Sequence, residues 1–339
     1  MSHTTKHTWS DLVRPIRWAH GPGFPREAPL PISGPVEAVT TSVDQIRLMT
    51  YNIHFGVGPI DALGVWPSRD EVLEHLDGIV GLALTESVDV LCLQEVDLDA
   101  ARSGGINQVE YIADKADYPW RAVAPVWNAG YIPWPLWPPR AHMGRTYSAI
   151  AVLSRIPLRA HQRTLLPKPE ENHWWYNQFY LERAVQRIRV DLGSLPVTIF
   201  NLHLEAFGKT TRMRQARLLV DLVRRHGGSS SLICGDFNAL PPYAKTRHDF
   251  ADEPDNDMRG DATMAIIEAG LPRHLDPLDS RRGGPPPQTA WSYPATNPNR
   301  RLDYALIDKL KLNAADARVI QGVQHSDHCP LVLTLQQRC

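Results

Sequence analysis

Short apolar runs of strand length, separated by polar segments, dominate the chain from residue 46 onward. Runs rich in Val, Ile and Leu are typical of β-strands, and a run with almost no polar interruption indicates a strand buried on both faces. The predicted strands cover residues 46–53, 88–96, 148–158, 186–192, 197–205, 231–237, 301–308 and 329–335. The pattern therefore predicts a fold built around β-sheet.

Three segments instead carry the apolar spacing of amphipathic helices. Ser68 followed by Glu71 is the signature of a capping box, and apolar residues at helical spacing follow it as far as residue 83. Further helices are predicted over residues 107–116 and 210–226. Because several strands follow one another without a helix between them, the order favours two packed sheets with helices outside over an all-parallel doubly wound sheet.

The chain is predicted to divide at about residue 45. Residues 1–44 are rich in Pro, Gly, Ser and Thr and show no periodicity, so we expect an irregular leader that either wraps the domain or forms a disordered tail. No linker splits the remainder, which predicts a single domain over residues 45–339.

Composition places the chain among globular proteins, with 43% hydrophobic and 22% charged residues. The net charge of −1 gives no general attraction to nucleic acid, although a local basic groove is compatible with it. No stretch is long and apolar enough to span a membrane, and the first residues lack a signal-peptide core. Four cysteines without metal spacing indicate free thiols, so we expect a cytoplasmic protein.

Polar residues end or follow five of the apolar runs, where a rigid sheet would aim them into one crevice. One such residue alone is more often a turn former, but carboxylates buried close together call for a cation. Carboxylates and carboxamides without thiolates favour Mg²⁺, with Mn²⁺ as a possible substitute. The residues are Asn52, Glu95, Asn201, His203, Asp236, Asn238, Asp327 and His328.

The chemistry of these residues suggests roles in metal binding. Glu95 and Asp327, helped by Asn52, suit a Mg²⁺ ion that keeps open positions for water and phosphate. The strand period of two predicts that Asp236 and Asn238 point to the same side. These two side chains would then share either a second metal or the attacking water.

The histidines suit phosphoester hydrolysis. His328 acts as acid or base near neutral pH if a carboxylate orients its ring, and Asp303, within an apolar run, is the predicted partner. His203 would donate to a phosphoryl oxygen as charge develops. We expect the other histidines to be ordinary surface residues.

Two aromatic stretches, residues 127–145 and 172–180, stand out from the rest of the chain. They either pack on each other as long loops or form a wall or lid against a base, a sugar or an acyl chain. The second possibility assigns substrate binding to Trp134, Trp137, Arg145, Tyr147, Arg183 and Asn201, with the two arginines gripping a phosphate.

Six motifs between residues 46 and 336 resemble those of the endonuclease/exonuclease/phosphatase superfamily, in its order: TYNIH, LQEVD, NLHLE, GDFNALP, RLDYALI and SDHCPL. The stretches around residues 97–113 and 148–158 are most similar to stand-alone bacterial members. The resemblance implies a four-layer α/β sandwich of two mixed sheets, and attack of water on phosphorus with Mg²⁺ bound. It implies Glu95 as the principal metal ligand and His328, paired with Asp303, as a catalytic residue.

Three functions remain open. The favoured one is a Mg²⁺-dependent hydrolase of a small or lipid-linked phosphoester. The second is a nuclease or a nucleic-acid repair phosphodiesterase, and the third is a binding module with an inactive site. Every position that the motifs require carries the expected residue type, which disfavours the third. The sequence predicts no protein partner.

Overall fold

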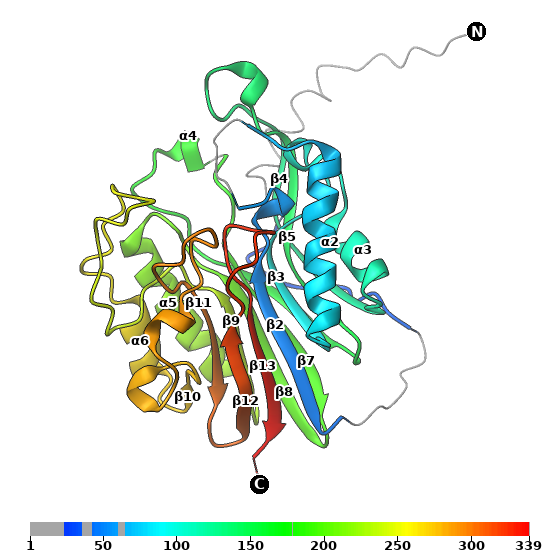
Figure 1. Cartoon of the computed structure of the whole chain (residues 1–339), viewed down its shortest axis with the longest axis vertical. Helices are drawn as coiled ribbons and strands as arrows, with labels where there is room; N and C mark the ends of the chain where they lie inside the picture. The colour runs from blue at the N-terminus through cyan, green and yellow to red at the C-terminus, as the bar shows by residue number, and fades with distance from the viewer. Residues whose placement is uncertain (1–23, 36–42, 60–64, 178, 339) are drawn as a thin grey trace.

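Two mixed β-sheets pack face to face, with helices on both outer faces, in the computed structural model (Figure 1). The structure describes residues 24–35, 43–59, 65–177 and 179–338. Helices α2 (Arg69–Thr85) and α3 (Gln108–Lys115) cover one sheet, and α5 (Lys209–His226) and α6 (Thr263–Gly270) cover the other. The predicted four-layer α/β sandwich is confirmed.

Two parallel strand pairs set the direction of the sheets. Sheet A has the order β1 (Glu27–Pro29), β6 (Arg159–Leu165), β7 (Ala184–Leu192), β8 (Leu195–His203), β9 (Ser231–Asp236), β11 (Asp303–Asp308) and β10 (His274–Leu275). Sheet B has the order β12 (Leu312–Val319), β13 (Leu331–Gln337), β2 (Gln45–Asn52), β3 (Val90–Asp97), β5 (Gly144–Ser154) and β4 (Trp120–Ile132). Because β8 runs parallel to β9 and β2 runs parallel to β3, the two strands of each pair end on the same side. A hydrogen bond between Asn52, at the end of β2, and Asp236, at the end of β9, shows that both pairs end on the same side of the sandwich.

The central strands are buried on both faces, as their apolar runs predict. In β2, Ile46 and Leu48 pack between the two sheets, whereas Met49 and Tyr51 pack beneath α2 and α3. All four side chains are fully buried. Alternate residues of one strand therefore join two different cores.

Local signals place the helix starts. The Oγ of Ser68 accepts from the backbone N–H of Glu71, whose carboxylate accepts from the N–H of Ser68, so the predicted capping box forms. Asn107 caps α3 in a similar way. The remaining helical segments are short: η1 (His54–Gly56), η2 (Ala101–Ser103), η3 (Pro139–Ala141), α4 (Trp174–Asn177), η4 (Ser280–Arg282) and η5 (Pro287–Ala290).

Several elements were not predicted, and most of them lie at sheet edges. Strands β1, β4, β10 and β12 are the outermost strands, and β6 is bordered on one side only by the three residues of β1. Residues 27–29 fall within the predicted leader; they form the short strand β1, which pairs with β6. The other leader segments, residues 1–23 and 36–42, lie outside the described residues.

Two further expectations concern the chain as a whole. Among the described residues, no helix has the length and apolar character needed to cross a membrane. Cys92, Cys234 and Cys329 are buried free thiols, as the sequence predicts.

Candidate active site

Strand register places three predicted site residues side by side at one end of sheet A. His203 is opposite Asp236 in the β8–β9 pair, and Asp303 is opposite Asp236 in the β9–β11 pair. From sheet B, Asn52 at the end of β2 donates through Nδ2 to Oδ2 of Asp236, over 3.0 Å. The ends of both sheets therefore converge on Asp236.

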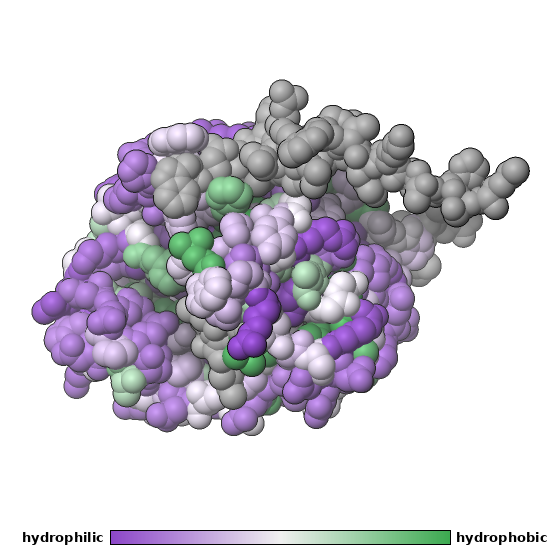
Figure 2. All heavy atoms as spheres, turned by 90° about the horizontal axis from the view of Figure 1, so that it is seen from above, coloured by the Kyte–Doolittle hydropathy of each residue, from purple (hydrophilic) through white to green (hydrophobic). Residues whose placement is uncertain are grey.

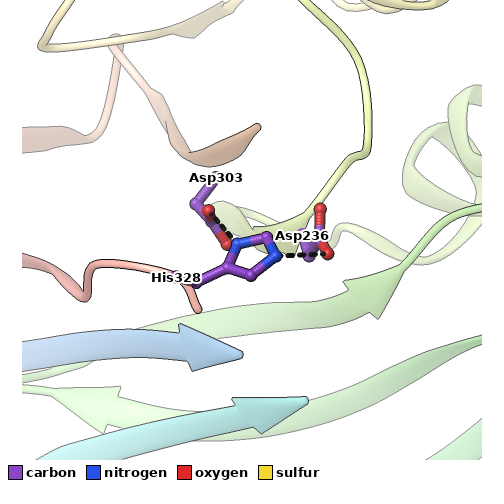
Figure 3. Close-up of side chains that lie close together, drawn as sticks. All are labelled: Asp236, Asp303 and His328. Carbon is purple, nitrogen blue, oxygen red and sulfur yellow. Dashed lines mark hydrogen bonds and ion pairs between the residues drawn. The ribbon is translucent and has the colours of Figure 1, made fainter. Parts of the chain in front are cut away.

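His328 lies beside this cluster, just before β13. Its Nδ1 is 2.7 Å from Oδ2 of Asp303, and its Nε2 is 3.7 Å from Oδ2 of Asp236 (Figure 3). Burial alone would lower the pKa of His328, but the carboxylates of Asp303 and Asp236 outweigh it and raise that pKa well above its usual range. The ring is therefore a cation at neutral pH.

A serine fixes the backbone on which His328 stands. The Oγ of Ser326 donates to the carbonyl oxygen of Asn52 over 2.7 Å and accepts from the N–H of His328. The loop before β13 is thus attached to the end of β2. This attachment holds the histidine against the carboxylates of sheet A.

Asp236 and Asn238 do point the same way, but not for the reason that the sequence suggested. Strand β9 ends at Asp236, so the strand period does not extend to Asn238. Asn238 instead has a left-handed φ of 49°, its N–H donates to Oδ1 of Asp236, and its Nδ2 donates to the carbonyl of Leu204. A tight turn that only short polar residues readily adopt brings the carboxamide back beside the carboxylate.

The turn depends on a glycine at the end of β9. Gly235 has a φ of 135°, and a Cβ at this position would lie 2.0 Å from the carbonyl oxygen of Leu202 on β8. Only glycine allows this backbone conformation and this close approach.

Burial raises the pKa of Asp236 to about 7, although the nearby His328 acts in the opposite direction. Asp236 is 1% exposed and accepts hydrogen bonds from Asn52 and Asn238. A carboxylate with this pKa exchanges a proton readily near neutral pH, which is what a general base requires.

Glu95 reaches the site because its strand is irregular. The β3–β5 register shifts between Leu93 and Val96, and Glu95 has a φ of 53°. Its Oε1 lies 3.7 Å from Nε2 of His203, and within the described residues it accepts no hydrogen bond. Burial raises the pKa of Glu95, while nearby His54 acts to lower it.

A divalent cation suits these carboxylates. Among the described residues, no group donates a hydrogen bond to Glu95. Asp327, whose Oδ1 is 3.6 Å from Nδ1 of His54, lies close enough to contribute to the raised pKa of Glu95. Oxygen ligands are those that Mg²⁺ prefers. Asp236, Asp303 and His328 also offer ligand atoms within 4.8 Å of one another, so a second cation-compatible group adjoins the first.

An arginine lies against the ring of His203. Nη1 of the buried Arg183 lies 2.6 Å from Nε2 of His203, and its Nε is 4.0 Å from a carboxylate oxygen of Glu205. Burial, Arg183 and His328 together lower the pKa of His203 well below its usual range. His203 is therefore neutral at pH 7, beside a fixed positive charge.

Asn201 occupies a different place from the one that its assignment requires. Its side chain has no exposed surface and donates to the carbonyls of Leu93 and Ala151, while its Oδ1 accepts from Gln94. It lies between the two sheets, on the same face as His203 but one step deeper. In this position the side chain of Asn201 is not accessible to a substrate, which disagrees with the direct substrate contact predicted for it.

Four other predicted substrate-binding residues lie in β5 or at the tip of the β4–β5 hairpin. Arg145 is exposed and forms an ion pair with Asp99, and Tyr147 is half-buried. Trp134 and Trp137 are exposed at the tip of the β4–β5 hairpin. None of these four contacts the carboxylates described above in any hydrogen bond or ion pair of the described residues.

The two aromatic stretches do pack on each other at one point. Trp127 belongs to β4 and is buried, and its Nε1 donates to the carbonyl of Phe179. It packs with Ile132, Met143 and Leu181 in a small cluster. The prediction that the two stretches pack on each other is therefore confirmed around Trp127, whereas Trp134 and Trp137 do not belong to this cluster.

Three residues near the site were not predicted. His54 was assigned to the surface, yet its Nδ1 is 3.6 Å from Asp327; its place two residues after Asn52 in the TYNIH motif was the available signal. The ring of Tyr293 lies 4.8 Å from that of His328, and no sequence motif marks it. Buried Glu205, in the NLHLE motif, accepts from Tyr180 and the N–H of Phe207.

A hollow opens beside Glu95 and His203. Its other walls are mostly apolar, and it is lined by Phe55, Val126, Trp127, Ser148, Ala149, Ile150, Leu181, Glu182 and Ala184. An uncharged group of a substrate therefore has an apolar surface next to the carboxylates.

Solved structures share this fold. An endonuclease/exonuclease/phosphatase from Beutenbergia cavernae is 22% identical, with a TM-score of 0.63, and the match covers 87% of this chain and 72% of that one. The human Nocturnin catalytic domain with bound sulfate is 18% identical, with a TM-score of 0.56 over 92% and 97% of the two chains. Danio rerio TDP2 with a single-strand DNA product is 14% identical, with a TM-score of 0.54 over 86% and 99%.

No curated protein matches the chain in sequence. A family model does: that of the Endonuclease/Exonuclease/phosphatase family matches residues 49–328, a span that begins within β2 and ends at His328. Five of the six motifs and the first three residues of the sixth fall within this span, as do the strand ends that carry the clustered residues. The chain therefore belongs to the endonuclease/exonuclease/phosphatase family, whose members are phosphoester hydrolases.

Proposed function

We propose that the protein is a Mg²⁺-dependent hydrolase whose substrate is a small or lipid-linked phosphoester. One observation carries the proposal: a carboxylate that accepts no hydrogen bond within the described residues, a carboxylate of raised pKa and a cationic histidine converge with a buried arginine at one end of the sandwich. A carboxylate that lacks donors suits a metal, and the two cations suit a phosphoryl group.

Metal binding is proposed for Glu95 and Asp327, with Asn52 holding Asp236 nearby. A Mg²⁺ ion bound there would polarise a phosphoryl oxygen and neutralise its charge. Mn²⁺ takes the same ligand types and would substitute. The 2.7 Å contact between His328 and Asp303 is an ordinary hydrogen bond, so we assign these two residues to proton and charge transfer and not to the principal metal site.

The chain's own residues would then divide the remaining work. Asp236 takes a proton from the attacking water, whose oxygen forms the new bond to phosphorus as the bond to the leaving oxygen breaks. Asn238 orients that water. His328, kept cationic by Asp303, donates to a phosphoryl oxygen as negative charge develops, and Arg183 with His203 faces the same group.

The surroundings favour a small or lipid-linked substrate over duplex nucleic acid. Asp252 and Glu253 lie in an acidic loop, and both form ion pairs with the buried Arg300. Glu253 also accepts a hydrogen bond from the hydroxyl of Tyr293, whose ring lies against that of His328. Because these two carboxylates share one guanidinium, one negative charge beside the site is not neutralised, and it repels a long polyanion such as duplex DNA. The walls of the hollow next to Glu95 are mostly apolar, which favours an uncharged group over a further phosphate at this place.

A substrate panel tests the proposal. Purified protein with Mg²⁺, Mn²⁺ or EDTA is assayed against bis-p-nitrophenyl phosphate, inositol phosphates, phospholipids, single-stranded DNA and plasmid. We expect turnover only with metal and loss of it in Glu95→Gln and His328→Ala, while Glu74→Gln, an exposed helix position, keeps full activity. Turnover in EDTA would refute the mechanism. Rapid plasmid nicking would instead establish the nuclease, and inactivity on every substrate would support a binding module.

A further inference from the structure

We propose that the tip of the β4–β5 hairpin, residues 131–142, docks on the surface of a lipid membrane. The proposal rests on surface chemistry and position, and it does not depend on which phosphoester the site hydrolyses. It names a neutral, zwitterionic lipid surface as the partner, because the tip offers apolar side chains and little free charge.

Three large apolar side chains stand close together at the tip. Trp134, Leu136 and Trp137 are 41%, 74% and 79% exposed. Single exposed apolar residues are normal on protein surfaces, but three within four positions form a patch. Tryptophan is the residue most enriched where lipid headgroups meet acyl chains, because its ring is apolar and its N–H is polar.

The tip holds these side chains on a fixed support. The N–H of Met143 donates to the carbonyl of Trp134 over 2.8 Å, and the hydroxyl of Tyr131 lies 2.5 Å from Nδ1 of His142. At its base, Ile132 packs in the buried cluster around Trp127. A surface ordered before binding loses little conformational entropy when it docks.

The tip lies at the same end of the molecule as the candidate active site. In Figure 1 the hairpin extends beyond the end of the sandwich where β2 and β3 finish. Viewed from that end, green hydrophobic patches lie among pale surface of intermediate hydropathy near the middle of the face, beside a strongly hydrophilic purple group, and most of the surrounding surface is purple (Figure 2). Two more exposed aromatic residues, Phe207 after β8 and Trp174 in α4, belong to segments near this end.

Charge argues for lipid over nucleic acid. Within residues 131–142 the only arginine or lysine is Arg140, and the next one, Arg145, is paired with Asp99. Single-stranded nucleic acid is held by a cationic groove together with stacking rings, and Leu136 has no ring to stack. A projecting apolar tip with one cation instead suits insertion into the headgroup region.

Vesicle binding tests the proposal, with Glu95→Gln as the background so that hydrolysis does not alter the lipid. Co-sedimentation with phosphatidylcholine vesicles is measured for this protein and for the same protein carrying Trp134→Ala, Leu136→Ser and Trp137→Ala. We expect the triple substitution to lower the partition coefficient by at least roughly tenfold. Leu310→Ser is the matched control, since Leu310 is an exposed apolar residue after the far end of β11, and it should leave binding unchanged.

Other results would overturn the proposal. If the triple variant binds vesicles as well as the parent protein does, the membrane contact lies outside the tip. If the parent protein does not bind vesicles, the proposed docking on a membrane is excluded. Light scattering that shows a dimer lost in the triple variant, without vesicle binding, would assign the tip to a second copy of this chain. Anisotropy that shows tip-dependent binding of an oligonucleotide alone would assign it to nucleic acid. Circular dichroism checks that each variant folds, and failure of the substrate panel leaves these outcomes unaffected.

Discussion

Nδ1 of His328 lies 2.7 Å from Oδ2 of Asp303, and this carboxylate is the largest of the charges that raise the pKa of the histidine. The two residues come from different segments, the loop before β13 and the first position of β11. Their contact fixes the ring so that Nε2 faces Asp236. Asp303 therefore both orients the ring of His328 and favours its charged form.

Replacing Asp303 by Asn tests this pairing. An amide keeps the shape of the carboxylate but not its charge, so we expect kcat to fall by roughly 10²–10⁴-fold with a smaller change in KM. Steady-state kinetics on the best substrate of the panel measures both. Asp308→Asn, at the opposite end of the same strand and equally buried, should change kcat by less than about threefold. Equal losses in both variants would point to a structural effect on β11.

Metal binding is expected to stabilise the folded chain through Glu95. With Mg²⁺ at about 100 times its Kd the free energy of unfolding should rise by about 2.7 kcal/mol, since the ion binds only the folded state. Differential scanning calorimetry with Mg²⁺ and with EDTA measures the resulting rise in Tm. Glu95→Gln should abolish the rise. An unchanged Mg²⁺ effect in that variant would place the ion elsewhere.

Arg183 is expected to act through the geometry of its guanidinium as well as its charge. Lysine keeps the charge but loses the planar fork, so Arg183→Lys should lower kcat/KM by roughly 10- to 100-fold. Arg189→Lys serves as the control and should be neutral, because Arg189 lies in β7, the strand that follows Arg183, with its side chain exposed. Full activity in Arg183→Lys would show that charge alone is sufficient.

Gly235 is predicted to be essential for the packing of β8 against β9. A Cβ there would lie 2.0 Å from the carbonyl oxygen of Leu202, so Gly235→Ala should cost roughly 3 kcal/mol or more in the free energy of unfolding. Gly260→Ala is the control that separates backbone strain at a positive φ from the steric clash of the new Cβ. Gly260 also has a positive φ, but no neighbouring atom lies within 4 Å of a Cβ built on it. It should cost only about 1 kcal/mol. Urea unfolding of both variants gives the comparison.

His274 should make the fold less stable in acid. Burial lowers its pKa from 6.5 to about 4, so the unfolded chain binds the proton more readily and stability falls as the pH drops through this window. Between pH 7 and 4.5 this histidine accounts for a loss of roughly 2 kcal/mol. Urea unfolding at the two pH values should show a smaller loss in His274→Gln, where the amide can still bond Ser231. An identical loss would assign the acid sensitivity to other groups.

The sequence predicted the central strands well and the edge strands poorly. A strand such as β3 is covered on both faces and must be apolar throughout, so its pattern is unmistakable. Edge strand β12 has mostly half-buried or exposed side chains and a polar sequence, which is compatible with a loop. Strand β4 was not predicted either, because its pattern mixes buried and half-buried positions, and only its residues 127–132 fall within the aromatic stretch of residues 127–145.

Asn201 and His203 show how far strand periodicity carries a site prediction. Both lie on the same face of β8, as the period of two requires. His203 is at the carboxyl end, where the strand meets the site, whereas Asn201 is two residues deeper and bonded to sheet B. The strand period predicts which face of the strand a side chain lies on. How far that side chain lies from the active site depends on how the other sheet packs against the strand.

The sequence by itself determined the chemistry and the ends of the strands that carry it. Apolar runs, caps and turns are local, so the motifs around Asn52, Glu95, Asp236 and His328 could be located without a structure. Only the tertiary structure decided which groups touch: the contact of His54 with Asp327, the burial of Asn201, and the difference between a buried Trp127 and an exposed tip. These contacts join segments distant in the chain, and their geometry depends on sheet register and packing that no single segment encodes.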